Sequence, residues 1–100
     1  MSRAQIPIPR GSITEFCHRN RVKSLALFGS VLRADFRPDS DVDVLVEFQP
    51  EAKVGFLALS RMQRELAVLF QRPVDLVPKD GLKLLIREAV LASTEVVYAG

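Results

Sequence analysis

Short runs of apolar residues along the chain predict β-strands. The run at 22–28 is continuously apolar in its second half, which is typical of a strand covered on both faces, and it ends at Gly29. Apolar and polar residues alternate at 42–48, and a third short run at 73–77 is closed by a proline. A final edge strand is expected at 95–98. These segments predict a small sheet.

Between the predicted strands, apolar residues recur with the periodicity of a helix. Ser12 and Glu15 have the spacing of a capping box, so a short helix is predicted from about 13 to 20. A long helix is predicted over 54–70 and a last helix over 81–91. The buried stripe expected on the long helix consists of Leu59, Met62, Leu66, Leu69 and Phe70.

This alternation of helices and strands predicts an α/β (α+β) sandwich, in which helices pack on a small sheet. A chain of 100 residues suits one domain, 1–100, and the segment 1–10 is expected to be a loose lead-in because it holds two prolines and few anchors. No apolar run approaches the roughly 20 residues of a membrane span, and no signal peptide is evident. We therefore expect a cytoplasmic protein.

Charge and cysteine content narrow the function classes further. The formal charge of +2 is compatible with an anionic ligand but too small to indicate direct nucleic-acid binding. Cys17 is the only cysteine, so no internal disulfide can form. Cys17 and His18 lie together on the first predicted helix, but no third partner is visible. A structural role is therefore favoured over a nucleophile.

Two aspartates interrupt an otherwise apolar strand prediction. Asp41 and Asp43 lie on the face opposite Val42, Val44 and Val46. Because same-face neighbours in a strand are about 6.5–7 Å apart, the two carboxylates can converge on one cation or bridge two. Hard oxygen ligands favour magnesium, with manganese as a substitute, whereas zinc would want histidine or thiolate.

A third acid lies on a separate strand. Asp75 is the only charged residue in 73–77, and it can join Asp41 and Asp43 if its strand lies beside 42–48. There it could complete a metal shell or accept a proton from an attacking hydroxyl. The alternative is that Asp41 only closes a loop and that the other two acids lie at exposed edges. Three acids after a glycine turn favour the site.

A glycine turn precedes the acidic strand. Gly29 follows a buried strand and precedes a predicted helical turn, a setting in which backbone N–H groups can point at an anion, and Ser30 adds a hydroxyl donor. Arg33 and Arg37 flank the loop of this turn, and either could neutralise phosphate charge. Arg33 could equally brace the loop by pairing with Asp35 or Asp39.

The turn and the acids form one motif of constrained spacing. Its residues are Gly29, Ser30, Arg33, Asp35, Ser40, Asp41, Val42 and Asp43, followed by apolar Val44, Leu45 and Val46. The motif resembles that of the minimal nucleotidyltransferase family, within the DNA polymerase beta-like superfamily. The resemblance extends over nearly the whole chain. Ala34 stands where the family commonly has glycine, and Val31 and Leu32 replace more usual polar or small residues.

The resemblance implies a nucleotidyltransferase fold, a mixed sheet flanked by helices, with two magnesium ions carrying ATP. Asp41, Asp43 and Asp75 match the metal-binding acids, and Gly29 and Ser30 match the phosphate-contacting turn. The implied chemistry is attack by an acceptor hydroxyl on the α-phosphate, which releases pyrophosphate. The Arg33 side chain would contact the nucleotide.

The resemblance also implies a partner. Members of the family often accompany a HEPN-domain ribonuclease toxin, act as its antitoxin, and in some cases transfer AMP to its tyrosine, so we expect a hetero-oligomer. Leu84, Leu91, Val97 and Tyr98 could form the partner-binding patch, although a fully packed last helix explains the two leucines equally well. Adenylylation of a partner hydroxyl is the favoured function. The alternatives are an antitoxin that acts by binding alone and a nucleotide sensor without turnover.

Overall fold

The computed structural model describes residues 6–32, 41–81, 90 and 93–100. The predicted loop 36–40 with Arg33 and Arg37, and nearly all of the predicted helix 81–91, lie outside the described residues. The elements are α1 (Arg10–Arg19), β1 (Val22–Phe28), the 3-10 turn η1 (Gly29–Leu32), β2 (Val42–Phe48), α2 (Phe56–Phe70), β3 (Val74–Pro78), the 3-10 turn η2 (Lys79–Gly81) and β4 (Glu95–Ala99).

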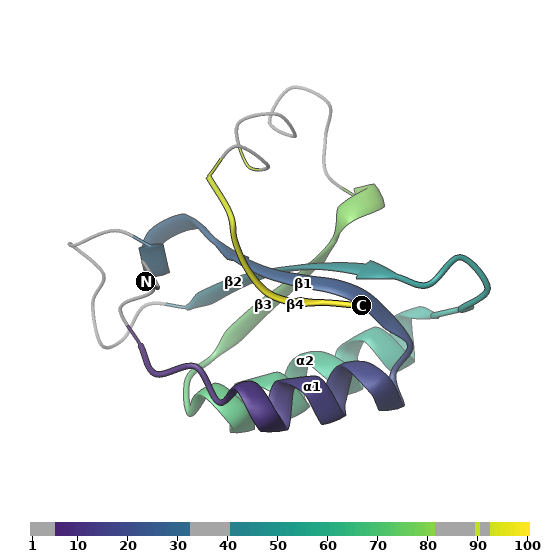
Figure 1. Ribbon diagram of the computed structural model, residues 1–100, viewed down its shortest axis with the longest axis horizontal. Coiled ribbons are helices and arrows are strands. Elements are labelled where there is room, and N and C mark those ends of the chain that lie inside the picture. The colour runs from purple at the N-terminus through teal and green to yellow at the C-terminus, as the bar shows by residue number, and fades with distance from the viewer. Residues whose placement is uncertain (1–5, 33–40, 82–89, 91–92) are drawn as a thin grey trace.

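The four strands form one mixed sheet in the order β3-β2-β1-β4. β1 runs antiparallel to both β2 and β4, whereas β2 and β3 are parallel. α1 and α2 lie side by side on one face of this sheet (Figure 1). The predicted class of helices packed on a small mixed sheet is therefore confirmed.

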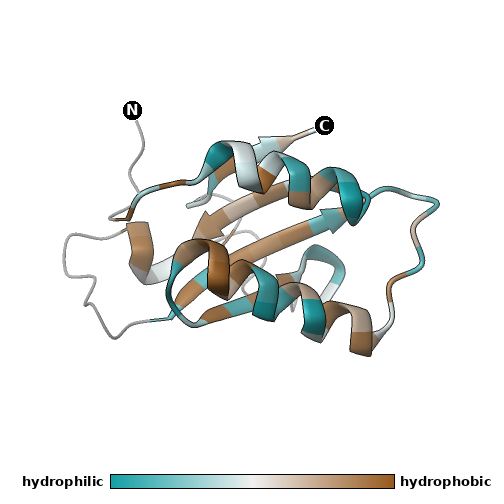
Figure 2. Cartoon of the chain, turned by 90° about the horizontal axis from the view of Figure 1, so that it is seen from below, coloured by the Kyte–Doolittle hydropathy of each residue, from teal (hydrophilic) through white to brown (hydrophobic). Residues whose placement is uncertain are grey.

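The core lies between the sheet and these two helices. Val42, Val44 and Val46 of β2 are buried against it, while Asp43 and Glu47 lie on the other face, as the alternation predicts. Viewed from the helix side, hydrophobic strands run behind the two helices (Figure 2). None of the helices in the described part of the chain has the length and apolar character of a membrane span.

α2 packs through its predicted stripe. Met62, Leu66 and Phe70 are buried, and Leu59 and Leu69 pack against them half-buried. The helix begins at Phe56, two residues later than predicted, because Gly55 has an extended backbone. It ends at Phe70, and the left-handed conformation of its C-cap residue Gln71 (φ 56°) turns the chain toward β3.

The start of the chain differs from its prediction. α1 begins at Arg10, with Pro9 as its N-cap, and Ser12 makes no capping hydrogen bond. The N–H of Ile13 donates to the Pro9 carbonyl (2.9 Å), and proline, which lacks an N–H, loses no hydrogen bond at a helix start. The lead-in is also anchored from Ile6 onward, because that side chain is buried in the core.

The prediction of a partner-binding patch near the end of the chain is wrong for one of its residues. Val97 lies in the core, because β4 pairs with β1 and α1 packs over it. Tyr98 is half-buried, and its ring meets His18 of α1 edge to face at a centroid distance of 5.9 Å. Leu84 and Leu91 lie outside the described residues.

Candidate active site

Two of the predicted acids lie on adjacent strands in matching positions. Asp43 pairs with Asp75 across the parallel strands β2 and β3, and on its other side it pairs with Phe28 at the end of β1. Paired residues share a face of the sheet, and neighbouring strands are about 4.8 Å apart. The two carboxylates therefore form a row on the face away from α1 and α2, as the sequence predicts if β3 neighbours β2.

Hydrogen bonds on both sides hold β3 in this register. The Val42 N–H donates to the Pro73 carbonyl at 2.9 Å, which starts the β2–β3 pairing one residue before β3 itself. The Leu76 N–H donates to the side-chain oxygen Oε1 of Gln63 in α2, also at 2.9 Å. Asp75 lies between these two bonds, so its backbone position is fixed from both neighbours although its side chain is exposed.

The glycine turn packs directly against the acid row. Gly29 begins η1 with a left-handed backbone (φ 76°), a conformation that glycine adopts without strain. A Cβ atom at this position would lie 2.4 Å from Oδ2 of Asp43. Val31, two residues on, is fully buried and anchors the turn in the core. The predicted phosphate turn and the acidic strand are thus in contact.

The remaining predicted site residues are Asp41, Ser30 and Arg33. Asp41 is exposed and lies immediately before β2, and Ser30 belongs to η1. Arg33 lies outside the described residues. Within the described ranges, no three histidine, cysteine, aspartate or glutamate side chains are grouped so as to hold a metal ion. The donors fit magnesium in type, since all are carboxylates, but the three-acid metal site stays a prediction.

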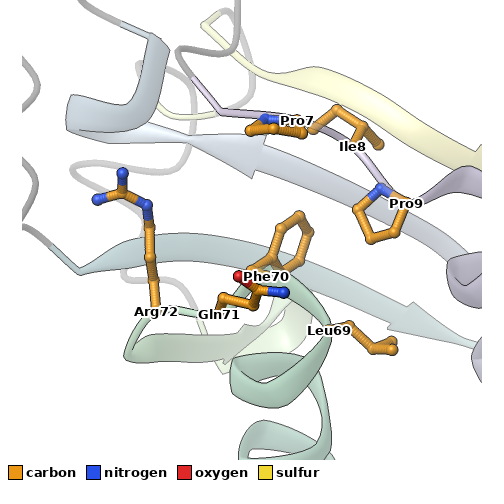
Figure 3. A pocket seen from close by; sticks show the side chains of 7 residues that line it. All are labelled: Pro7, Ile8, Pro9, Leu69, Phe70, Gln71 and Arg72. Atoms are coloured by element: carbon orange, nitrogen blue, oxygen red, sulfur yellow. The ribbon is translucent and has the colours of Figure 1, made fainter.

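A cation at the same end of the sheet was missed at the sequence level. Arg72 follows α2 and comes just before β3, where the sequence indicated only a helix stop. It lines a cavity of about 470 Å³ between the lead-in and the end of α2, and its side chain extends away from that helix (Figure 3). The other lining residues are Pro7, Ile8, Pro9, Leu69, Phe70 and Gln71, so none of the predicted site residues belongs to this cavity.

Cys17 has no part in the site. Its side chain is fully buried in the core, and burial raises the pKa of the thiol from 9.0 to about 12. Because the thiolate is the reactive form, the structural role favoured from sequence is the one that the structure supports.

This burial gives a pH prediction. Between pH 9 and 12 the unfolded thiol ionises while the folded one does not, so Cys17 should lower the free energy of unfolding as pH rises through this window. Labelling by a thiol reagent at pH 8 should be slow in the folded protein and fast in urea. Cys17→Ser is the blank, and rapid labelling without denaturant would contradict the burial.

Comparison with protein families gives a match over most of the chain. The family model described as "Nucleotidyltransferase domain" matches residues 10–97. Among curated proteins, the protein adenylyltransferase MntA of Thermococcus cleftensis is 39% identical over 84 residues, which cover 84% of this chain and 81% of that protein.

Solved structures share the fold. A toxin–antitoxin complex with AMP-PNP contains a chain that matches with a TM-score of 0.75 at 19% identity, covering 93% of this chain and 75% of that one. A complex of tri-AMPylated Shewanella oneidensis HEPN toxin with MNT antitoxin gives a TM-score of 0.67 at 19% identity, covering 91% and 70%. A candidate minimal nucleotidyltransferase gives 0.71 at 34% identity and 86% of both chains. The chain belongs to the nucleotidyltransferase domain family.

Proposed function

We propose that this protein transfers AMP from ATP to a hydroxyl group of a partner protein and thereby acts as an antitoxin. The observation that carries the proposal is the pairing of Asp43 with Asp75 on adjacent strands, with Gly29 packed against the first of them. Its relative in Thermococcus cleftensis, which is described as a protein adenylyltransferase, supports AMP as the transferred group and a protein as the acceptor.

Each residue of the site has a proposed role. The backbone N–H groups of η1, which begins at Gly29 and includes Ser30, would hold the triphosphate, and Arg33 would neutralise part of its charge. Asp41, Asp43 and Asp75 would hold two magnesium ions. Magnesium, when bound, supplies charge neutralisation on the α-phosphate and on the departing pyrophosphate.

The transfer balances without any further reactant. The acceptor hydroxyl oxygen forms a bond to the α-phosphorus, and the bond between that phosphorus and the oxygen leading to the β-phosphate breaks, so that pyrophosphate leaves. The hydroxyl proton passes to a carboxylate oxygen of Asp75, which is exposed to the incoming acceptor while Asp43 is half-buried. The product is a phosphodiester that joins AMP to the partner.

The acceptor would be a HEPN-domain toxin. A structural relative is a complex of MNT antitoxin with a tri-AMPylated HEPN toxin, which supports this class of partner and a hetero-oligomer. The acid row lies on the sheet face opposite α1 and α2, so neither helix covers it (Figure 1).

Mass measurement tests the proposal. The protein is incubated with magnesium, ATP and the HEPN-domain protein encoded beside it, and the mass of the latter is then determined. We expect a gain of one or more AMP units that disappears with Asp41→Ala plus Asp43→Ala. If no mass is added and this double variant still neutralises the toxin, the protein acts by binding alone.

A further inference from the structure

The outer face of α2 carries a stripe of exposed side chains that are not part of the core. Leu57, Arg61, Arg64 and Val68 follow one another at helical spacings of four, three and four residues, so they lie along one side of the helix. Leu57 is 82% exposed and Val68 is 75% exposed, and both arginines are exposed. In Figure 2, which looks onto this side, α2 is hydrophobic at its two ends and more hydrophilic between them.

The stripe is unusual for a solvated helix face. Phe56, beside Leu57, is 80% exposed as well, so the first turn of α2 presents two large apolar side chains to solvent. Within the described part of the chain, Arg61 and Arg64 form no ion pair or hydrogen bond. By contrast, Glu65 in the same helix pairs with Arg19 of α1. The two stripe arginines are therefore available to an outside acid.

A basic groove continues from this stripe. A hollow of about 460 Å³ lies between the end of α1 and the first half of α2, and Arg61 is part of its lining. Two further cations, Arg21 and Lys53, line it against the single acid Glu51, while the charge of Arg19, also in the lining, is balanced by Glu65. The positive charge of the stripe thus extends sideways, which favours an acidic partner.

A second copy of this chain fits the surface poorly. Two α2 helices packed antiparallel about a two-fold axis midway between Arg61 and Arg64 would match Leu57 with Val68. The same operation sets Arg61 of each copy against Arg64 of the other, so four like charges would meet at the centre of the interface. Like charges juxtaposed in an interface oppose association.

We infer that the stripe and its groove form a docking surface for an acidic, amphipathic protein surface, whose carboxylates meet Arg61 and Arg64 while apolar groups cover Leu57 and Val68. The two apolar ends are 11 residues apart, about 16 Å along the helix. A protein is favoured over nucleic acid because phosphate would satisfy the arginines but leave the apolar ends uncovered. A partner held here leaves the acid row, on the opposite face of the sheet, to the hydroxyl of a second partner molecule in the proposed hetero-oligomer.

The inference rests on the proposed function in one respect, the choice of the neighbouring HEPN-domain protein as the probe. Binding of this probe is measured by calorimetry, in an experiment separate from the assay of AMP transfer. Charge reversal by Arg61→Glu plus Arg64→Glu should weaken binding about tenfold to a hundredfold. Leu57→Ala plus Val68→Ala should weaken it as well. The matched control is Arg10→Glu plus Lys23→Glu, which changes the net charge equally at exposed positions on α1 and β1 and should leave binding unchanged.

The outcomes separate the two proposals. Unaltered binding by the folded Arg61→Glu, Arg64→Glu variant overturns the docking surface, whether or not AMP is transferred. Binding that is lost in this variant and kept in the control, with no AMP transferred by the wild type, supports the surface and counts against the proposed function. Two further results would also overturn the inference: an RNA oligonucleotide that binds only through these arginines, or a wild-type dimer that Leu57→Glu dissociates.

Discussion

Replacing Asp43 with asparagine should reduce AMP transfer by at least about a hundredfold, the lower range for losing a group that acts directly on the reacting atoms. Asparagine keeps the shape of the side chain and removes its charge, so β2 and its packing against Gly29 should persist. The loss should therefore appear in turnover with little change in the thermal unfolding temperature. Initial rates of AMP incorporation, measured beside circular dichroism, provide the check.

The control for this variant is an aspartate outside the acid row. Asp80 lies in η2, after the far end of β3, so Asp80→Asn removes the same charge away from the acid row. We expect it to transfer AMP at the wild-type rate. Equal rates for Asp43→Asn and the wild type would show that the acid row is not the catalytic centre and would favour an antitoxin that acts by binding.

The central strands could be predicted from sequence because their signal is local. β1 and β2 begin and end where the apolar runs at 22–28 and 42–48 begin and end. Gly29 terminates the first run, and the alternation of β2 separates Asp43 from its valines without any knowledge of neighbouring elements. The long helix was also predicted well, since three of its stripe residues are buried in the core.

Tertiary contacts account for the errors. The capping pattern at Ser12 is locally plausible, but Ile6 and Ile8 pack on the core and lead the chain into α1 earlier, at Pro9. Val97 near the end of the chain looked exposed, yet the pairing of β4 with β1 buries it. Both errors lie near the chain termini, where non-local packing decides the structure and a sequence pattern carries little information about it.

The site residues also differ in how far the sequence alone could predict them. Asp43 could be predicted from sequence because it interrupts an apolar strand. Asp75 could be included only on the condition that β3 lies beside β2, which is a property of the sheet order. The direct contact between Gly29 and Asp43 depends on tertiary structure, because Gly29 follows the end of β1 and only the antiparallel register of β1 and β2 brings it beside Asp43.

That contact makes Gly29→Ala the second test with a large expected effect. Alanine in a left-handed conformation costs about 1–2 kcal/mol of folding free energy. In addition, its Cβ would lie 2.4 Å from Oδ2 of Asp43, far inside van der Waals contact, so the carboxylate must move. We therefore expect a lower free energy of unfolding in urea together with at least a tenfold loss of AMP transfer.

Gly11→Ala is the matched control because it makes the same substitution inside α1, where an added Cβ meets nothing within 4 Å. Alanine is a better helix former than glycine by up to about 1 kcal/mol, so this variant should be more stable and fully active. If Gly29→Ala were destabilised but retained wild-type transfer, the turn would serve the fold alone. If transfer is lost at urea concentrations below those that unfold the variant, the glycine instead sets the position of the Asp43 carboxylate. The turn and the acid then act as one unit.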